Sequence, residues 1–169
     1  MTSDTVSRTS RISEQDAAVG FTASRQLAES LQAVLVDLVE LHLQGKQAHW
    51  NLVGHNFRDL HKQLDHIVDY ARDAGDTIAE RMRSLHAVPD GRSDTVVAST
   101  TLPAFPEGEL SVAAVVDLVT TRLHAATATL RRVHDGVDAE DPSSADLLHG
   151  IIDKLEQYAW MVSSENREV

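Results

Sequence analysis

Residues 46–65 read KQAHWNLVGHNFRDLHKQLD, and this stretch joins two long segments that share one apolar spacing. Over 27–41 and again over 57–85, apolar residues recur every three or four positions, as in helices that bury one face. The polar, glycine-containing residues 51–56 between these segments favour a short turn. Two helices joined by so short a turn are predicted to be antiparallel neighbours.

The same apolar spacing returns in the second half of the chain, over 112–137 and 148–162. No proline interrupts any of these segments, so each can form a continuous helix. Asp141 followed by Pro142 is a typical helix start, with a capping acid and then proline at the first helical position. Four such helices in one chain indicate an all-α four-helix bundle. The predicted helices span 24–49, 57–85, 111–137 and 143–164.

A long connection, residues 86–110, separates the second and third helices and carries three of the four prolines. A connection of this length can run along the whole bundle, as it does in ferritin-like folds. The fragment 94–99 inside it is predicted to form a short extra helix. The predicted organisation is therefore a flexible arm at 1–20, a ferritin-like four-helix bundle at 21–165 and a short C-terminal tail at 166–169.

The composition of the chain excludes several classes of protein function. The 169 residues suit one domain, and 15 Lys and Arg against 26 Asp and Glu give a net charge of −11. This charge argues against a surface that is basic throughout and binds nucleic acid or anionic lipid. The absence of cysteine excludes disulfides, thiolate catalysis and Cys-ligated metal sites, and it suits a reducing cytoplasm. No apolar run is long enough to span a bilayer, so no membrane partner is expected.

Four side chains of the second helix form a pattern with metal-binding chemistry. His61 and Asp65 are spaced i, i+4, and Asp76 and Glu80 repeat this spacing farther along the same face. Imidazole combined with carboxylates suits divalent iron, manganese or zinc. The alternative is a solvated helix face with pairing between charges. The cations that could serve as partners are Lys62, Arg72, Arg81 and Arg83.

Geometry decides how these four residues could share one site. Asp65 and Asp76 are ~16 Å apart along a helix, so one chain cannot bring both pairs to one ion. Two copies packed antiparallel about a twofold axis near 70–71 would set 61–65 of one copy against 76–80 of the other. Small residues at 71, 74 and 75 would permit the close approach. His49, just before the turn, could then fold back toward His61.

Other metal sites are less well supported. The chain contains no Glu-x-x-His motif, which argues against a di-iron site inside a single bundle, and no His-Glu-x-x-His zinc-protease motif. A surface or half-buried structural role is expected for each remaining histidine. These are His42, His55, His66, His86, His124, His134 and His149.

Residues 46–65 resemble the signature of the Dps family, the DNA-protecting relatives of ferritin in starved bacterial cells. Residues 76–82 resemble the second signature segment of this family, and 144–148 together with 155–160 resemble its last helix. The resemblance extends over about residues 25 to 165. It implies a four-helix subunit that assembles into a hollow dodecamer, in the bacterial cytoplasm and in association with the nucleoid in some members.

The resemblance also implies a ferroxidase centre at the twofold interface, which holds at most two iron ions (Fe²⁺/Fe³⁺). Hydrogen peroxide would oxidise Fe(II) there, dioxygen would do so less well, and ferric mineral would collect in the cavity. Trp50, beside His49, would intercept stray oxidising equivalents, with a place in the core as the alternative. The implied metal ligands and catalytic residues are His49, His61 and Asp65 of one subunit and Asp76 and Glu80 of its neighbour.

Two charged regions bear on transport and on DNA. The acidic run from 135 to 146 is read as a solvated loop or as the lining of a threefold pore, with Asp141 and Asp146 as candidates. Both termini carry a net charge of −1, counted over 1–20 and 163–169, which argues against DNA binding through either tail. The leading function is therefore peroxide-dependent ferroxidation with iron storage. The alternatives are a DNA-coating shell with little catalysis and a single-bundle metal protein of another kind.

Overall fold

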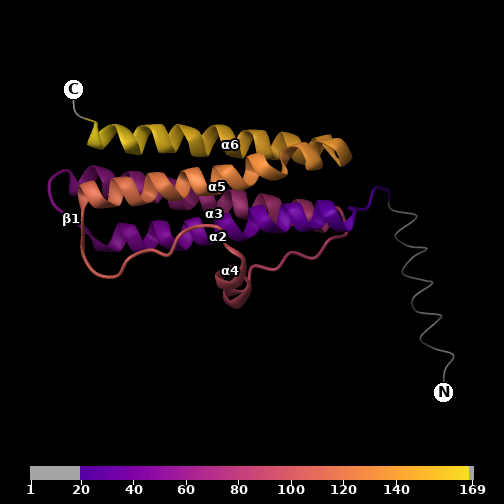
Figure 1. Ribbon diagram of the computed structural model, residues 1–169, viewed down its shortest axis with the longest axis horizontal. Coiled ribbons are helices and arrows are strands. Elements are labelled where there is room, and N and C mark those ends of the chain that lie inside the picture. The colour runs from indigo at the N-terminus through magenta and orange to yellow at the C-terminus, as the bar shows by residue number, and fades with distance from the viewer. Residues whose placement is uncertain (1–19, 168–169) are drawn as a thin grey trace, which may run out of the picture.

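The computed structural model describes residues 20–167, so the predicted N-terminal arm lies almost entirely outside the described residues. Four long helices form an elongated bundle (Figure 1). None of the helices within 20–167 is both long and apolar enough to cross a membrane. The elements are α2 (Arg25–Asn51), β1 (Leu52–Val53), α3 (Phe57–Ser84), α4 (Ser93–Ser99), β2 (Leu110–Ser111), α5 (Val112–Glu140), α6 (Pro142–Ser163) and the 3-10 helix η1 (Ser164–Asn166).

The four predicted helices and the short extra helix are confirmed, and their ends shift by a few residues. The first helix continues to Asn51 and the third to Glu140, because no residue there stops a helix before Gly54 and Pro142. The helix α6 begins at Pro142 after Asp141, as predicted, but the Asp141 side chain forms no capping hydrogen bond. Two residues of the turn adopt positive φ, at Asn56 and Gly54.

The predicted apolar stripes form the core. The five residues of the first stripe are all at most 1% exposed, namely Leu27, Leu31, Val34, Leu38 and Leu41. One prediction for the second stripe is wrong, since Phe57 is 41% exposed at the head of α3. Near the turn α2 and α3 approach closely, because a Cβ at Gly45 would lie 2.9 Å from Val68 Cγ2. Glycine at this position therefore brings the two helices together just before His49.

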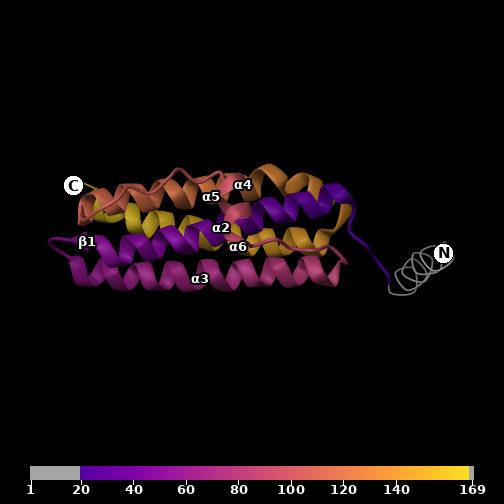
Figure 2. The ribbon, with the colours of Figure 1, turned by 90° about the horizontal axis from the view of Figure 1, so that it is seen from below.

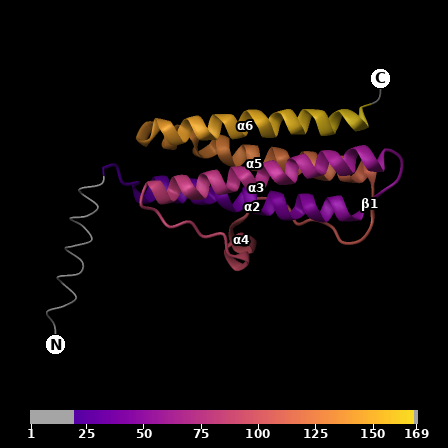
Figure 3. The ribbon, with the colours of Figure 1, turned by 180° about the vertical axis from the view of Figure 1, so that it is seen from behind.

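The crossover from α3 to α5 runs along the bundle (Figure 2), and α4 packs against α2 on the side away from α6 (Figure 1 and Figure 3). Buried polar groups hold it in place. Asp37, fully buried, accepts hydrogen bonds from the Thr100 hydroxyl and from the backbone and hydroxyl of Thr101. Arg122, also buried, donates to the carbonyl oxygens of Pro103 and Ala104.

At the end of the crossover, β1 and β2 form a parallel pair of two residues each. Leu52 pairs with Leu110, and Val53 pairs with Ser111. The alternating pattern that marks strands is absent from so short a pair, so the sequence did not predict it. The pairing joins the turn after α2 to the start of α5, at the end of the bundle where His49 lies.

Candidate metal centre

His49 and His61 lie face to face across the α2–α3 hairpin. Their ring centroids are 3.6 Å apart and their planes differ by 24°. The Nδ1 atom of each ring lies 3.0 Å from the backbone carbonyl oxygen of the other residue. Because a carbonyl oxygen only accepts, Nδ1 carries the proton in both rings and each Nε2 keeps a free lone pair. This tautomer leaves Nε2 free to bind a metal while Nδ1–H donates to a backbone carbonyl, as is common at metal sites.

Asp65 completes a group of three on the same hairpin. It follows His61 by one helical turn, and its Oδ1 lies 3.2 Å from His49 Nδ1. Candidate ligand atoms of the three residues all lie within 4.8 Å of one another, and no other group of three within residues 20–167 meets this condition. His49 is buried and the other two are half-buried. The predicted approach of His49 to His61 is thus observed, and the donor set suits a divalent transition metal.

Lys46 is a member of this site that sequence reasoning did not single out. Its Nζ atom lies 2.6 Å from Asp65 Oδ1. The hydrogen bond from Lys46 is the main cause that lowers the pKa of Asp65, and the nearby imidazoles of His49 and His61 lower it further. Asp65 is therefore a carboxylate at neutral pH, paired with an ammonium that an incoming cation must displace. The sequence feature that could have identified Lys46 is its i, i+3 spacing from His49, which places both residues on one face of α2.

Asp76 and Glu80 lie apart from this group, as the helix geometry requires. Both are exposed on α3, and neither forms an ion pair with another residue of the described chain. The cations considered as their partners are engaged elsewhere or unpaired within residues 20–167. Arg81 pairs with Asp141 at 2.7 Å, and Arg72 contacts Asp73 at 3.4 Å. Pairing between charges along α3 therefore does not explain the two acids.

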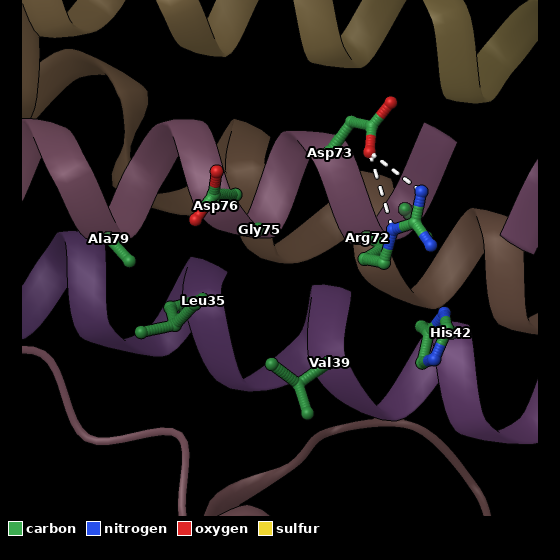
Figure 4. Close-up of a pocket in the computed structure, with 9 residues that line it drawn as sticks. Leu35, Val39, His42, Arg72, Asp73, Gly75, Asp76 and Ala79 are labelled. Carbon is green, nitrogen blue, oxygen red and sulfur yellow. Dashed lines mark hydrogen bonds and ion pairs between the residues drawn. The ribbon is translucent and has the colours of Figure 1, made fainter. Parts of the chain in front are cut away.

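Asp76 lines an open groove of about 410 Å³ between α2 and α3 (Figure 4). In the groove Asp76 and Ala79 of α3 lie opposite Leu35 and Val39 of α2. The remaining lining residues are His42, Ala71, Arg72, Asp73 and Gly75. Of the three small residues expected to permit close helix approach, Ala71 and Gly75 form part of this groove, whereas Ala74 lines a separate hollow beside α6.

The same hairpin exposes large apolar side chains. Leu43 and Trp50 are seven residues apart on one face of α2 and are 51% and 68% exposed. Trp50 is therefore not a core residue of the single chain. Phe57, at the head of α3, is also exposed, with its ring 5.0 Å from that of His61. Large apolar side chains left exposed on one hairpin are typical of surfaces that contact another molecule.

The two pore candidates differ in their surroundings. Asp141 is buried, where it pairs with Arg81 and accepts a hydrogen bond from the Ser144 hydroxyl. Burial alone would raise the pKa of Asp141, but the bonds from Ser144 and Arg81 outweigh it and lower the pKa. Asp146 is exposed on the first turns of α6. Of the two, Asp146 is the carboxylate open to solvent.

A four-helix bundle with one long crossover connection is the architecture of ferritin-like folds. The family model of the ferritin-like domain matches residues 28–168. Curated relatives include a DNA protection during starvation protein of Agrobacterium fabrum, which is 30% identical over 82% of this chain and 86% of its own length. The chain therefore belongs to the Dps family of ferritin-like proteins.

Two further comparisons agree with this assignment. DNA protection during starvation protein 2 of Deinococcus radiodurans is 35% identical over 86% of this chain, which spans 60% of the length of that relative. Among solved structures, Dps from Microbacterium arborescens in a high-iron form superposes with a TM-score of 0.81. It is 31% identical to this chain, and the match covers 88% of this chain and all of the other. These matches confirm the fold and the family predicted from the sequence.

Proposed function

We propose that this protein is a ferroxidase and iron store that oxidises Fe(II) with hydrogen peroxide, and dioxygen less well, at sites shared between two subunits. The observation that carries the proposal is the His49, His61 and Asp65 group. Its two imidazoles already hold the tautomer that leaves Nε2 free, and its carboxylate is ionised at neutral pH. Such a set of nitrogen and oxygen donors can bind ferrous iron as a substrate.

The second half of the proposed site comes from a neighbouring copy. In an antiparallel twofold packing of α3, His61 lies opposite Glu80 and Asp65 lies opposite Asp76, because each pair has the same sum of residue numbers. Both acids are exposed and unpaired within the described chain, and Asp76 lies in the open groove. The exposed Leu43 and Trp50 lie on the same hairpin and give the partner an apolar surface to cover.

In the proposed reaction the protein positions its substrates and balances their charge. The imidazoles and Asp65 hold ferrous iron from one side, and Asp76 and Glu80 of the second copy hold it from the other. Each ferrous ion gives up one electron, and one peroxide accepts two as its O–O bond breaks and its oxygens leave as hydroxide. The carboxylates offset the added positive charge of the ferric products. In this proposal Trp50, which is exposed and next to His49 in the sequence, takes up an oxidising equivalent that escapes the site.

The remaining family properties complete the proposal. The subunits form a hollow dodecamer that stores ferric mineral, and the exposed carboxylate of Asp146 helps to draw Fe(II) into a pore. The protein acts in the bacterial cytoplasm. The names of its relatives describe DNA protection. In this proposal the protein protects DNA chemically, since the reaction consumes peroxide and free ferrous iron together. Binding to DNA or to the nucleoid is not needed for this protection.

Complementation between two inactive variants tests both the chemistry and the shared site. His61→Ala and Asp76→Ala are each expected to oxidise Fe(II) slowly with peroxide while keeping the oligomeric mass of the wild type. If the site is shared, a mixed pair of subunits contains one intact site and one doubly damaged site. Random co-assembly after joint refolding should then restore about a quarter of wild-type activity.

Two matched samples make this result decisive. Each variant refolded alone, and the two variants mixed without refolding, should stay inactive. Activity that does not return on co-assembly would exclude the shared site, and normal rates in both single variants would exclude the ligand assignment altogether. A protein that coats DNA without catalysis would oxidise Fe(II) no faster than the uncatalysed reaction in the wild type and in both variants, and it would retard DNA in a gel.

A further inference from the structure

A second pair of histidines lies face to face on the other helical hairpin. His134, on the penultimate turns of α5, and His149, on the second turn of α6, have ring centroids 4.3 Å apart with planes tilted by 32°. They line an open hollow of about 470 Å³ together with Asp153 and three further charged residues, Arg131, Asp135 and Glu156. The sequence favoured a surface or structural role for both histidines.

The nitrogens of His134 are arranged as those of a metal ligand. Its Nδ1 lies 3.1 Å from the carboxylate of Asp135, which can only accept and therefore keeps the proton on Nδ1. Its Nε2 is buried and has no hydrogen-bond partner within residues 20–167. A buried nitrogen lone pair without a partner is costly in a folded protein, and a bound cation would remove that cost. A histidine whose outer nitrogen donates to a carboxylate is the usual form at metal sites.

The arrangement repeats that of the first hairpin. There, His49 near the end of one helix meets His61 on the next, and Asp65 follows His61 by four residues. Here, His134 near the end of α5 meets His149 on α6, and Asp153 follows by four residues and lines the same hollow. Both hairpins thus combine a histidine near the end of one helix with a histidine and an aspartate spaced i, i+4 on the next.

The second cluster lies far from the first. His134 is 22 residues beyond Val112, which starts α5 beside β1, and this corresponds to ~33 Å along the helix. Figure 1 shows α5 running from the end where β1 lies to the opposite end of the bundle. An ion at His134 therefore cannot share ligands with His49 and His61 of the same chain.

The second cluster is also more open than the first, since its ligand atoms do not form a group of three within 4.8 Å of one another in the described chain. His149 must turn to present a nitrogen beside His134 Nε2. It can do so because its side chain is 60% exposed and its nearest carboxylate, that of Asp146, lies 3.9 Å away. Arg131 is paired with Glu156 at 2.9 Å, so its charge is partly offset and Glu156 is not counted as a ligand.

We propose that His134, His149 and Asp153 form a second binding site for a divalent first-row transition-metal ion, at the end of the bundle opposite His49 and His61. Two imidazoles select such ions over Mg²⁺ and Ca²⁺, which prefer all-oxygen ligands. The site goes beyond the proposed ferroxidase function and does not depend on it. Its open geometry predicts weaker binding than at the first site.

Titration with Co²⁺ alone, by calorimetry, tests the proposal in a chain whose first site is removed. The variant His61→Ala, Asp65→Asn should still bind one Co²⁺ per chain. Adding His149→Ala, at an exposed position that does not endanger folding, should weaken this binding by at least about tenfold. Adding His124→Ala, which removes an exposed histidine from α5 outside the cluster, should leave it unchanged.

Anomalous scattering from Co²⁺-soaked crystals gives a second readout. A peak between His134 and His149 that disappears in the His149→Ala variant would support the site. The proposal is overturned if the variant without the first site binds no Co²⁺, if His149→Ala leaves the affinity for Co²⁺ unchanged, or if the peak lies elsewhere. None of these outcomes depends on iron oxidation, so they are separate from any failure of the ferroxidase proposal.

Discussion

The rings of His49 and His61 are oriented by each other's backbone, since each Nδ1 lies 3.0 Å from the carbonyl oxygen of the other residue. The hydrogen bonds join the end of α2 to the first turns of α3. Each side chain is therefore both a candidate ligand and the donor that fixes the backbone beneath the other. Removal of one imidazole should disturb the position of the second.

His49→Ala should lower the rate of peroxide-dependent Fe(II) oxidation at least about tenfold, because it removes one ligand and loosens another. The rate is followed by the absorbance of the ferric product on a sample of known oligomeric mass. The matched control is His66→Ala, which removes an exposed histidine from the same helix as His61. Equal rates for the two variants would contradict the role given to His49.

Lys46→Met should strengthen Co²⁺ binding at the first site by about two- to fivefold at neutral pH. The metal would no longer have to displace an ammonium from Asp65, and a half-exposed ion pair of this kind is worth about 0.2 to 1 kcal/mol. Calorimetric titration of both proteins measures the change. Lys62→Met, at an exposed position on α3, is the control, and weaker binding by Lys46→Met would contradict the prediction.

Asp141→Asn should destabilise the protein by about 1 to 3 kcal/mol at neutral pH, because it weakens a buried carboxylate's bonds to Arg81 and Ser144. The folded chain lowers the pKa of Asp141, so its contribution is complete above the unfolded-state pKa of about 4. It is lost as the pH falls through the folded-state pKa. Chemical denaturation at fixed protein concentration should therefore show a difference that shrinks in acid.

Asp146→Asn is the control for this stability measurement. Asp146 is exposed, so its substitution should leave the free energy of unfolding within about 0.5 kcal/mol of the wild type. A loss of stability that is the same at every pH would show that Asp141 acts through packing and not through its charge.

The assembled protein should not retard duplex DNA in a gel at low salt and neutral pH. Both termini carry a slight negative charge, and phosphate contacts require cations. Repeating the gel with Mg²⁺ in the buffer distinguishes two modes of binding. Bridging by cations would retard DNA only when Mg²⁺ is present, whereas direct binding would retard it in both gels. Tight retardation without divalent cations would contradict the prediction and favour the DNA-coating alternative.

Much of the fold could be predicted because each long helix carries its own apolar spacing. Leu27, Leu31 and Leu41 lie in the core as expected, and the turn at Gly54 and Asn56 joins the helices of the first hairpin. The course of the crossover along the bundle was expected from its length, but the contacts that fix it could not be predicted, because they join distant residues. Asp37, on the first helix, binds Thr100 and Thr101, and no local pattern relates positions so far apart.

The candidate site could be predicted in part for the same reason. His61 and Asp65 share a helix, so their spacing alone placed them together, and His49 required only the turn to close. Lys46 was missed because its pairing with Asp65 crosses between helices. The exposure of Phe57 was missed because its position fits the apolar spacing of α3. The spacing does not show that no other element covers the first residue of this helix.

The pairing of β1 with β2 has a consequence for how the protein opens. Leu52 and Val53 follow α2 directly and are bonded to Leu110 and Ser111, which precede α5. We therefore expect the segment between His49 and His61 and the start of α5 to open together. The rates of amide hydrogen exchange in the two segments should therefore change in parallel. A ligand bound to the α2–α3 hairpin should also slow exchange at the start of α5.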